Sequence, residues 1–220
     1  MIRKFKLFGL LAVAALALTA VAASAAQAAP EFHVESASSA TPATITGEQV
    51  GTQKFTTNAG TVECSTATFK GSTTVTTTTT QSLLPSYSGC KAFGFLTSTV
   101  TPNGCEYKFH LTAGGVSPYP ATVDVVCPSG KVIEVTTAFT SCKITVGSQN
   151  GLSGVSITNE GSKTTRDLKV SLEVTGVTYT QTGANCAGGE GTFSNGVLHG
   201  AATVKADVGS TSTQQGLFVL

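Results

Sequence analysis

The stretch CEYKFHLT, residues 105 to 112, decides the fold class of this chain. Cys105 and the apolar residues take every second position and polar residues fill the others, which is typical of a β-strand with one buried face. The stretch ATVDVVC, residues 121 to 127, alternates in the same way. If the two form an antiparallel hairpin with Cys105 opposite Cys127, Lys108 falls opposite Asp124 and every apolar residue meets another. A shift of one residue would break this match, so the sequence predicts both the hairpin and its register.

Alternation of this kind recurs along the chain, whereas helical periodicity is missing after the N-terminal segment. The stretch RDLKVSLEV, residues 166 to 174, is a second clear strand, and Asn195-Gly196 predicts a type I′ turn between two short strands. About a dozen short strands separated by turns predict an all-β protein, and we expect an antiparallel β-sandwich. A β-barrel, or two small β-subdomains that meet near residues 147 to 154, would fit the same pattern.

The N-terminus has the three segments of a secretory signal peptide. Three basic residues precede an apolar run from Leu7 to Val21, and small residues follow it. Cleavage after Ala28 is favoured over cleavage after Ala25, and the run is shorter than the ~20 residues that a membrane-spanning helix needs. We therefore expect a signal peptide over residues 1–28 and a single domain over residues 29–220. The protein is then secreted, either extracellular or associated with the cell surface, with no transmembrane segment in the mature chain.

The charge of the mature chain argues against a nucleic-acid partner. Removal of the leader takes away three of the 13 basic residues, which leaves 10 against 12 acidic residues. The remaining basic residues are scattered singly, whereas a nucleic-acid-binding protein clusters them to neutralise phosphates. The sequence therefore indicates no nucleic-acid partner.

The six cysteines all lie in the exported part, and an even number there predicts three disulfides. Neighbouring cysteines are at least fifteen positions apart, unlike the close pairs of zinc sites, so we expect no metal and no cofactor. The hairpin register favours a Cys105–Cys127 bond, and elimination then leaves Cys64–Cys90 and Cys142–Cys186. A Cys127–Cys142 bond, which would leave Cys105 for Cys186, is the competing arrangement.

Seven of the eight residues from Thr73 to Thr80 are threonine. Threonine is β-branched and favours strands, and hydroxyls on both faces leave little apolar surface to bury. We predict a solvent-exposed edge strand here. A flat threonine surface that docks ice or a polysaccharide is the alternative, but it would require the same pattern at a constant interval on neighbouring strands.

No catalytic motif stands out. His33, His110 and His199 are each isolated in or beside a predicted strand, and no nucleophile elbow is present. A glycoside hydrolase would need two carboxylates in one cleft, for which the candidates are Glu106, Asp124, Glu134 and Glu173. We interpret these residues as ordinary exposed ions and predict no catalytic residue.

Four segments, TVECSTATFKG, YSGCKAFGF, NGCEYKF and GTFSNGVLHGAATVKA, together carry a family resemblance. The chain resembles a group of secreted six-cysteine β-rich proteins of high-GC Gram-positive bacteria that has no assigned activity. The resemblance covers nearly all of the mature chain. It implies export, disulfides and an all-β fold, and it brings no catalytic residues with it.

Three functional hypotheses remain, and each requires a different structural feature. A binding or structural role comes first, with carbohydrate or the cell envelope as the expected ligand, and it requires exposed aromatic residues on one face. Tyr87, Tyr107, Tyr119 and Tyr179 are the few tyrosines available, and Tyr107 is expected to point inward. A secreted glycoside hydrolase requires a cleft with two carboxylates. A self-associating surface or matrix protein requires a long unprotected edge strand.

Overall fold

The computed structural model describes residues 29–220 except 36, 139–140, 163–164 and 209–212, so the predicted signal peptide lies outside the described residues. The described part is all β, and none of its segments is a helix that could cross a membrane. The strands are β1 (Phe32–Val34), β2 (Ala43–Thr57), β3 (Gly60–Thr73), β4 (Thr77–Thr78), β5 (Thr80–Ala92), β6 (Leu96–Thr101), β7 (Glu106–Leu111), β8 (Tyr119–Val126), β9 (Ile133–Thr137), β10 (Lys143–Val146), β11 (Gln149–Glu160), β12 (Asp167–Thr182), β13 (Gly191–Val208), β14 (Thr213–Gln215) and β15 (Leu217–Val219).

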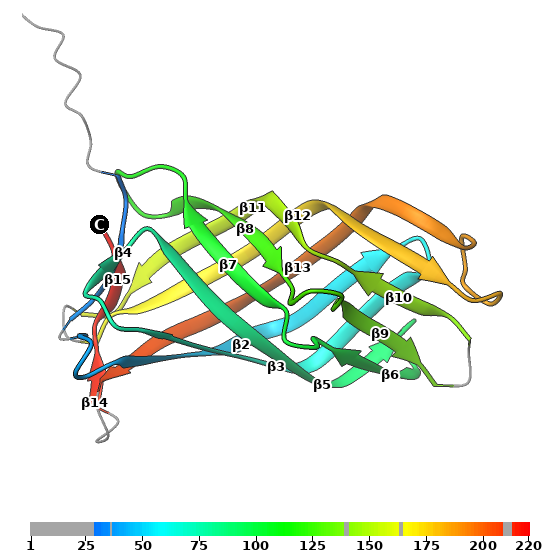
Figure 1. The fold of residues 1–220 in the computed structure, drawn as a ribbon, viewed down its shortest axis with the longest axis horizontal. Coiled ribbons are helices and arrows are strands. Elements are labelled where there is room, and N and C mark those ends of the chain that lie inside the picture. The colour runs from blue at the N-terminus through cyan, green and yellow to red at the C-terminus, as the bar shows by residue number, and fades with distance from the viewer. Residues whose placement is uncertain (1–28, 36, 139–140, 163–164, 209–212) are drawn as a thin grey trace, which may run out of the picture.

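Eight of these strands close into an antiparallel barrel in the order β13-β2-β3-β5-β7-β8-β11-β12 (Figure 1). Closure depends on two pairings, β5 with β7 and β12 with β13, which join the four strands β13-β2-β3-β5 to the four strands β7-β8-β11-β12. The all-β class and the three disulfides are confirmed. The architecture is the barrel, which was the alternative to the expected sandwich.

A second ring of strands shares five of the eight strands of this barrel. The beginning of β5 pairs with β7 and its end pairs with β6, while β12 pairs first with β11 and then with β10. Since β9 joins β6 to β10, two three-stranded sheets, β7-β8-β11 and β6-β9-β10, follow each other along the same gap between β5 and β12. The long strands β2, β3, β5, β12 and β13, of 13 to 18 residues, run past both sheets.

The barrel interior is the hydrophobic core. Inward positions alternate along each strand, as Val123 and Val125 on β8 and Val170 and Leu172 on β12 show with exposures of 3 to 7%. A small sheet in the order β15-β1-β4 closes one end of the barrel (Figure 1), and its inward side chains, Phe32 and Leu217 among them, join the same core. The opposite end carries the connections between β2 and β3, β5 and β6, β9 and β10, and β12 and β13.

The predicted hairpin is present as β7 and β8. Lys108 pairs in register with Asp124, as predicted, and the Cys105–Cys127 disulfide lies just beyond the paired residues. The other disulfides are Cys64–Cys90 and Cys142–Cys186, which are the pairs favoured from the sequence, and the described chain has no free cysteine.

Two local predictions were wrong. Asn195-Gly196 does not form a hairpin turn, because β13 continues through it and Gly196 pairs with Val177 at an irregularity in the β12–β13 register. The Asn195 side chain is used elsewhere: it accepts a hydrogen bond from the Tyr179 hydroxyl and donates one to the Asn58 side chain. The Asn-Gly sequence that predicted a turn therefore makes a tertiary contact instead.

The threonine-rich segment is not one edge strand. β3 ends at Thr73, a bend follows, β4 has only two residues, and β5 begins at Thr80. The hydroxyl of Thr73 exchanges hydrogen bonds with the backbone of Val75, and that of Thr78 does the same with Thr80. Such local bonds compete with strand pairing, which explains the interruption.

Candidate functional site

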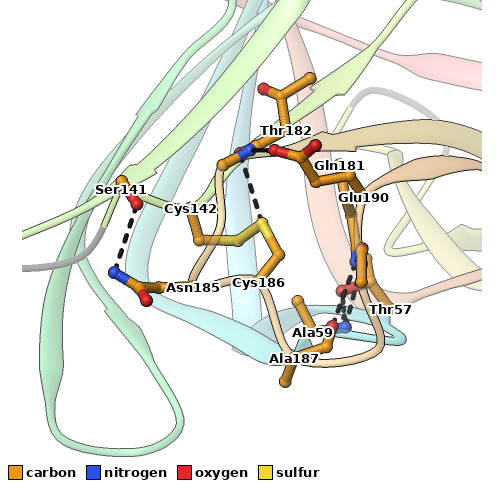
Figure 2. Close-up of a disulfide and its surroundings, with 12 residues drawn as sticks. Thr57, Ala59, Ser141, Cys142, Gln181, Thr182, Asn185, Cys186, Ala187 and Glu190 are labelled. Carbon is orange, nitrogen blue, oxygen red and sulfur yellow. Dashed lines mark hydrogen bonds between the residues drawn. A yellow bond between two sulfur atoms is a disulfide. The ribbon is translucent and has the colours of Figure 1, made fainter.

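The end of the barrel opposite the small sheet is held together by a disulfide and by buried polar side chains; we call it the loop end. It consists of residues 58–59, 93–95, 138–142 and 183–190, with 139–140 outside the described chain. The Cys142–Cys186 bond ties the β9–β10 connection to the long β12–β13 connection (Figure 2). Loops held on a rigid scaffold are where proteins most often place binding residues.

Gln181, at the end of β12, anchors this arrangement from inside. Its side chain is fully buried, and its amide nitrogen donates to the carbonyl oxygens of Ala187 and Gly189 at 3.1 and 2.7 Å. Its amide oxygen accepts a hydrogen bond from the backbone nitrogen of Ala59 at 3.0 Å (Figure 2). One side chain therefore joins the β12–β13 connection to the β2–β3 turn.

Tyr179 provides a second link two residues earlier on the same inward row. It is 1% exposed, and its hydroxyl accepts a hydrogen bond from the backbone nitrogen of Asn58 at 2.7 Å while it donates to Asn195 at 3.0 Å. Since a buried hydroxyl is stable only when hydrogen-bonded, the position of the β2–β3 turn is fixed.

Phe93 and Phe95 project from this end, in the turn between β5 and β6. Phe93 and Gly94 both have positive φ, 56° and 78°, as a type I′ turn requires, and Phe95 is 74% exposed. A non-glycine residue in this region is uncommon. It is supported here because the Phe93 nitrogen donates to the Thr61 carbonyl oxygen and its ring lies on Gly60, where a Cβ would come within 2.4 Å of it.

Phe93 also connects the aromatic turn to the disulfide. Its ring, Gly60 and Cys142 line one small void of about 10 Å³. Phe93 is 42% exposed, so one part of the ring packs against the loop end and the other part faces solvent. We call these two exposed phenylalanines of one turn the aromatic pair; Phe93 also packs against the loop end. Sequence reasoning missed this pair, although the motif AFGF, with two aromatics around a glycine in a turn, could have indicated it.

The candidate catalytic residues do not come together in one site. His110 lies 2.8 Å from Asp124, which also accepts a hydrogen bond from the Gly151 nitrogen, and His199 lies 3.0 Å from Glu173. Glu134 forms an ion pair with a lysine of β10, and His33 approaches Glu31 at 3.9 Å. Glu106 stands exposed on β7. In the described residues no three metal-ligating side chains come together, and none of the cavities described here contains two carboxylates.

The tyrosines do not form a surface for sugars. Tyr107, Tyr119 and Tyr179 are at most 7% exposed, and Tyr87 is partly buried against the core. The hydroxyls of Tyr87 and Tyr107 are hydrogen-bonded to each other at 2.8 Å. Burial raises the pKa of both phenols above the ordinary value of 10.0, and the neighbouring phenol raises that of Tyr87 further. The inward orientation of Tyr107 is confirmed.

The buried phenols predict a loss of stability in alkali. In the unfolded chain a tyrosine releases its proton near pH 10, whereas these two keep theirs to higher pH in the fold. Their contribution to stability is fully present below pH 10 and declines above it, by about 1.4 kcal/mol per pH unit for each phenol. Denaturant unfolding at a series of alkaline pH values measures this slope. The double variant Tyr87→Phe/Tyr107→Phe should show a shallower decline, and equal slopes in the two proteins would contradict the prediction.

The interrupted threonine segment borders a shallow polar cleft of about 330 Å³. Its lining carries hydroxyls and one amide and no charged side chain: Ser72, Thr73, Thr74, Thr78, Thr80, Gln81 and Ser82. The hydroxyls of Thr73 and Thr78 are already bonded to the backbone, so the cleft is explained by local turn structure.

Comparison with known proteins finds no match to a family model, to a curated protein or to a solved structure.

Proposed function

We propose that this is an exported, non-catalytic binding protein that recognises polysaccharide of the cell envelope through Phe93 and Phe95. The observation that carries the proposal is the exposed aromatic pair on a base fixed by a disulfide and by Gln181. An aromatic ring offers a large, rigid apolar surface, on which the C–H faces of a sugar ring can pack. Rigid anchors also lose little entropy on binding.

Export is supported by the three disulfides, which persist in oxidising compartments. The predicted signal peptide agrees with this inference from an independent part of the chain. Other connections of the loop end carry the exposed Asn58 and Asn185, whose amide groups suit the hydroxyls of a neutral glycan.

The two rival hypotheses have less support. A glycoside hydrolase needs two carboxylates that share a cleft, and the candidate acids of the described chain are dispersed over the outer surface. Self-association through a strand needs a long open edge, and the terminal strands of the described sheets, β4, β14 and β15, have two or three residues each.

We expect the oxidised mature protein to pellet saturably with purified cell wall or with one of a panel of insoluble polysaccharides, without releasing soluble sugar. Phe95→Ala should weaken this binding roughly tenfold or more, as loss of an aromatic anchor does at other interfaces. Because the Phe95 side chain is 74% exposed, its loss should change the free energy of unfolding by less than about 0.5 kcal/mol.

Two further variants make the result specific. Phe95→Tyr keeps the ring and should keep the binding, and Val116→Ala, which removes an 87% exposed side chain from the β7–β8 connection, should have no effect. Release of soluble sugar would favour the hydrolase. Failure to pellet with any of the materials, or equal pelleting by Phe95→Ala, would disprove the role of the aromatic pair.

A further inference from the structure

A cavity lies inside the barrel where its two three-stranded sheets meet. The sheets β7-β8-β11 and β6-β9-β10 lie one beyond the other along the barrel (Figure 1). Val123 and Val125 of β8 and Ile133 and Val135 of β9 line the same space, of about 70 Å³, together with residues of the long strands. Side chains from the ends of two sheets leave this part of the interior incompletely filled.

The lining is apolar apart from a few polar groups that include the Tyr87–Tyr107 pair. Small-molecule sites typically combine an apolar cavity with a small number of polar groups of this kind. An eight-stranded barrel either fills its interior with side chains or holds one small ligand there. This barrel fills most of its interior and leaves the space beside the two phenols.

The two phenols carry two hydroxyl protons, and the hydrogen bond between them uses only one of these protons. Each hydroxyl carries one proton, and burial keeps both phenols protonated, but only one proton can lie between two oxygens 2.8 Å apart. Among the described residues neither hydroxyl has another hydrogen-bond partner. The second proton therefore lacks an acceptor at the edge of an apolar cavity, where an unmatched donor is unfavourable.

A second polar atom without a partner lies nearby. Ser98 is 7% exposed, and its hydroxyl has no hydrogen bond to the described part of the chain. It belongs to the same inward row of β6 as Val100, which lines the cavity. The interior thus holds two hydroxyls whose hydrogen-bonding capacity the chain leaves unused.

We infer that the barrel interior binds a small, mainly apolar molecule with one hydrogen-bond acceptor, such as a short-chain ketone, whose oxygen accepts the unused proton of the Tyr87–Tyr107 pair. The size fits this class: an engineered apolar cavity of roughly 150 Å³ takes up benzene, and a cavity of about half that volume takes a molecule of a few heavy atoms. The site is separate from the loop end and does not depend on the proposed recognition of polysaccharide.

The test uses butanone and its alkene isostere, in which a methylene group replaces the carbonyl oxygen. With methyl-labelled valines, titration of the oxidised protein with butanone should produce saturable NMR shifts at Val123 and Val135 and none at Val170, which is buried but does not line the cavity. The alkene has no hydrogen-bond acceptor, so its binding should not depend on the two phenols. Tyr87→Phe/Tyr107→Phe should weaken butanone binding by roughly threefold to tenfold, the usual effect of one hydrogen bond, and should not weaken alkene binding.

A substitution that reduces the volume of the cavity provides an independent test of where the probes bind. Val135→Ile adds one methylene group to the lining and should abolish binding of both probes, whereas Val170→Ile, a matched change outside the lining, should leave it intact. Butanone binding that the tyrosine variants do not weaken would overturn the inference. Binding of neither probe, with water exchange detected at the phenols, would also overturn it and would identify the space as a hydrated gap.

Discussion

Replacing Cys142 and Cys186 together by serine is expected to lower the free energy of unfolding by about 4 kcal/mol. The bond joins residues 44 positions apart, the longest separation of the three disulfides. Loop-closure entropy in the unfolded chain increases with this separation, so its removal gives the unfolded state the most freedom. Denaturant unfolding of the variant and of the native protein measures the difference.

Cys64→Ser/Cys90→Ser is the matched control. That bond joins residues in register on adjacent strands, 26 positions apart, and its loss is expected to cost about 3.5 kcal/mol by the same estimate. The two variants should differ in which part of the chain loses local protection against amide exchange. Amide exchange of Ala59, which Gln181 binds, should accelerate beyond the change in global stability only after loss of Cys142–Cys186. Unchanged local protection would show that the disulfide does not fix the loop end.

The substitution Gln181→Glu is expected to cost about 3 to 5 kcal/mol at neutral pH. The new carboxylate can still accept the hydrogen bond from the Ala59 nitrogen, but it would face the carbonyl oxygens of Ala187 and Gly189 without protons to donate. A buried, unmatched charge of this kind is among the most destabilising single changes.

The cost should depend on pH in a defined direction. Burial against two carbonyl oxygens raises the pKa of the introduced carboxyl in the folded state above its unfolded value of about 4.3, because only the protonated form can donate. The lost stability should therefore return as the pH falls through the folded pKa. Gln149→Glu, at a half-buried amide that exchanges two hydrogen bonds with Thr178, should cost less and recover less. Equal costs at the two positions would contradict the role assigned to Gln181.

The parts of the fold that could be predicted are those in which neighbouring segments constrain each other. The β7–β8 register followed from two alternating stretches, each with a cysteine at one end, since only one alignment buries all apolar residues. The same register favoured the Cys105–Cys127 bond, and Cys64–Cys90 with Cys142–Cys186 was then the preferred one of the three arrangements that four cysteines allow. Local alternation contains the information for this hairpin register and for the bond at its end.

Barrel closure could not be predicted, because it depends on pairings between strands distant in sequence. Strands with one buried face alternate identically in a sandwich and in a barrel, and only the pairing of β5 with β7 and of β12 with β13 distinguishes the two. The interior cavity follows from the same closure, since its lining comes from both three-stranded sheets.

The candidate site was missed for a related reason. The importance of Gln181 depends on carbonyl groups of a connection that folds back over it, and a single glutamine carries no pattern in the sequence. The alternation of Phe93 and Phe95 also fits a strand with one buried face. The structure shows instead that both lie in a turn outside the barrel. Lys108 lies opposite Asp124, as the register predicted, but the diagonal neighbour His110 contacts the carboxylate.

The pairing of β2 with β13 sets the moment at which the barrel can form. β2 is synthesised long before β13, which is one of its two neighbours, and β1 is synthesised long before its partner β15. Such non-local pairings are slow to form. In the cytosol this delay would leave the edge of β2 unpaired and prone to aggregation, whereas in a chain that is exported, as we propose, it would keep the polypeptide unfolded while it crosses the membrane.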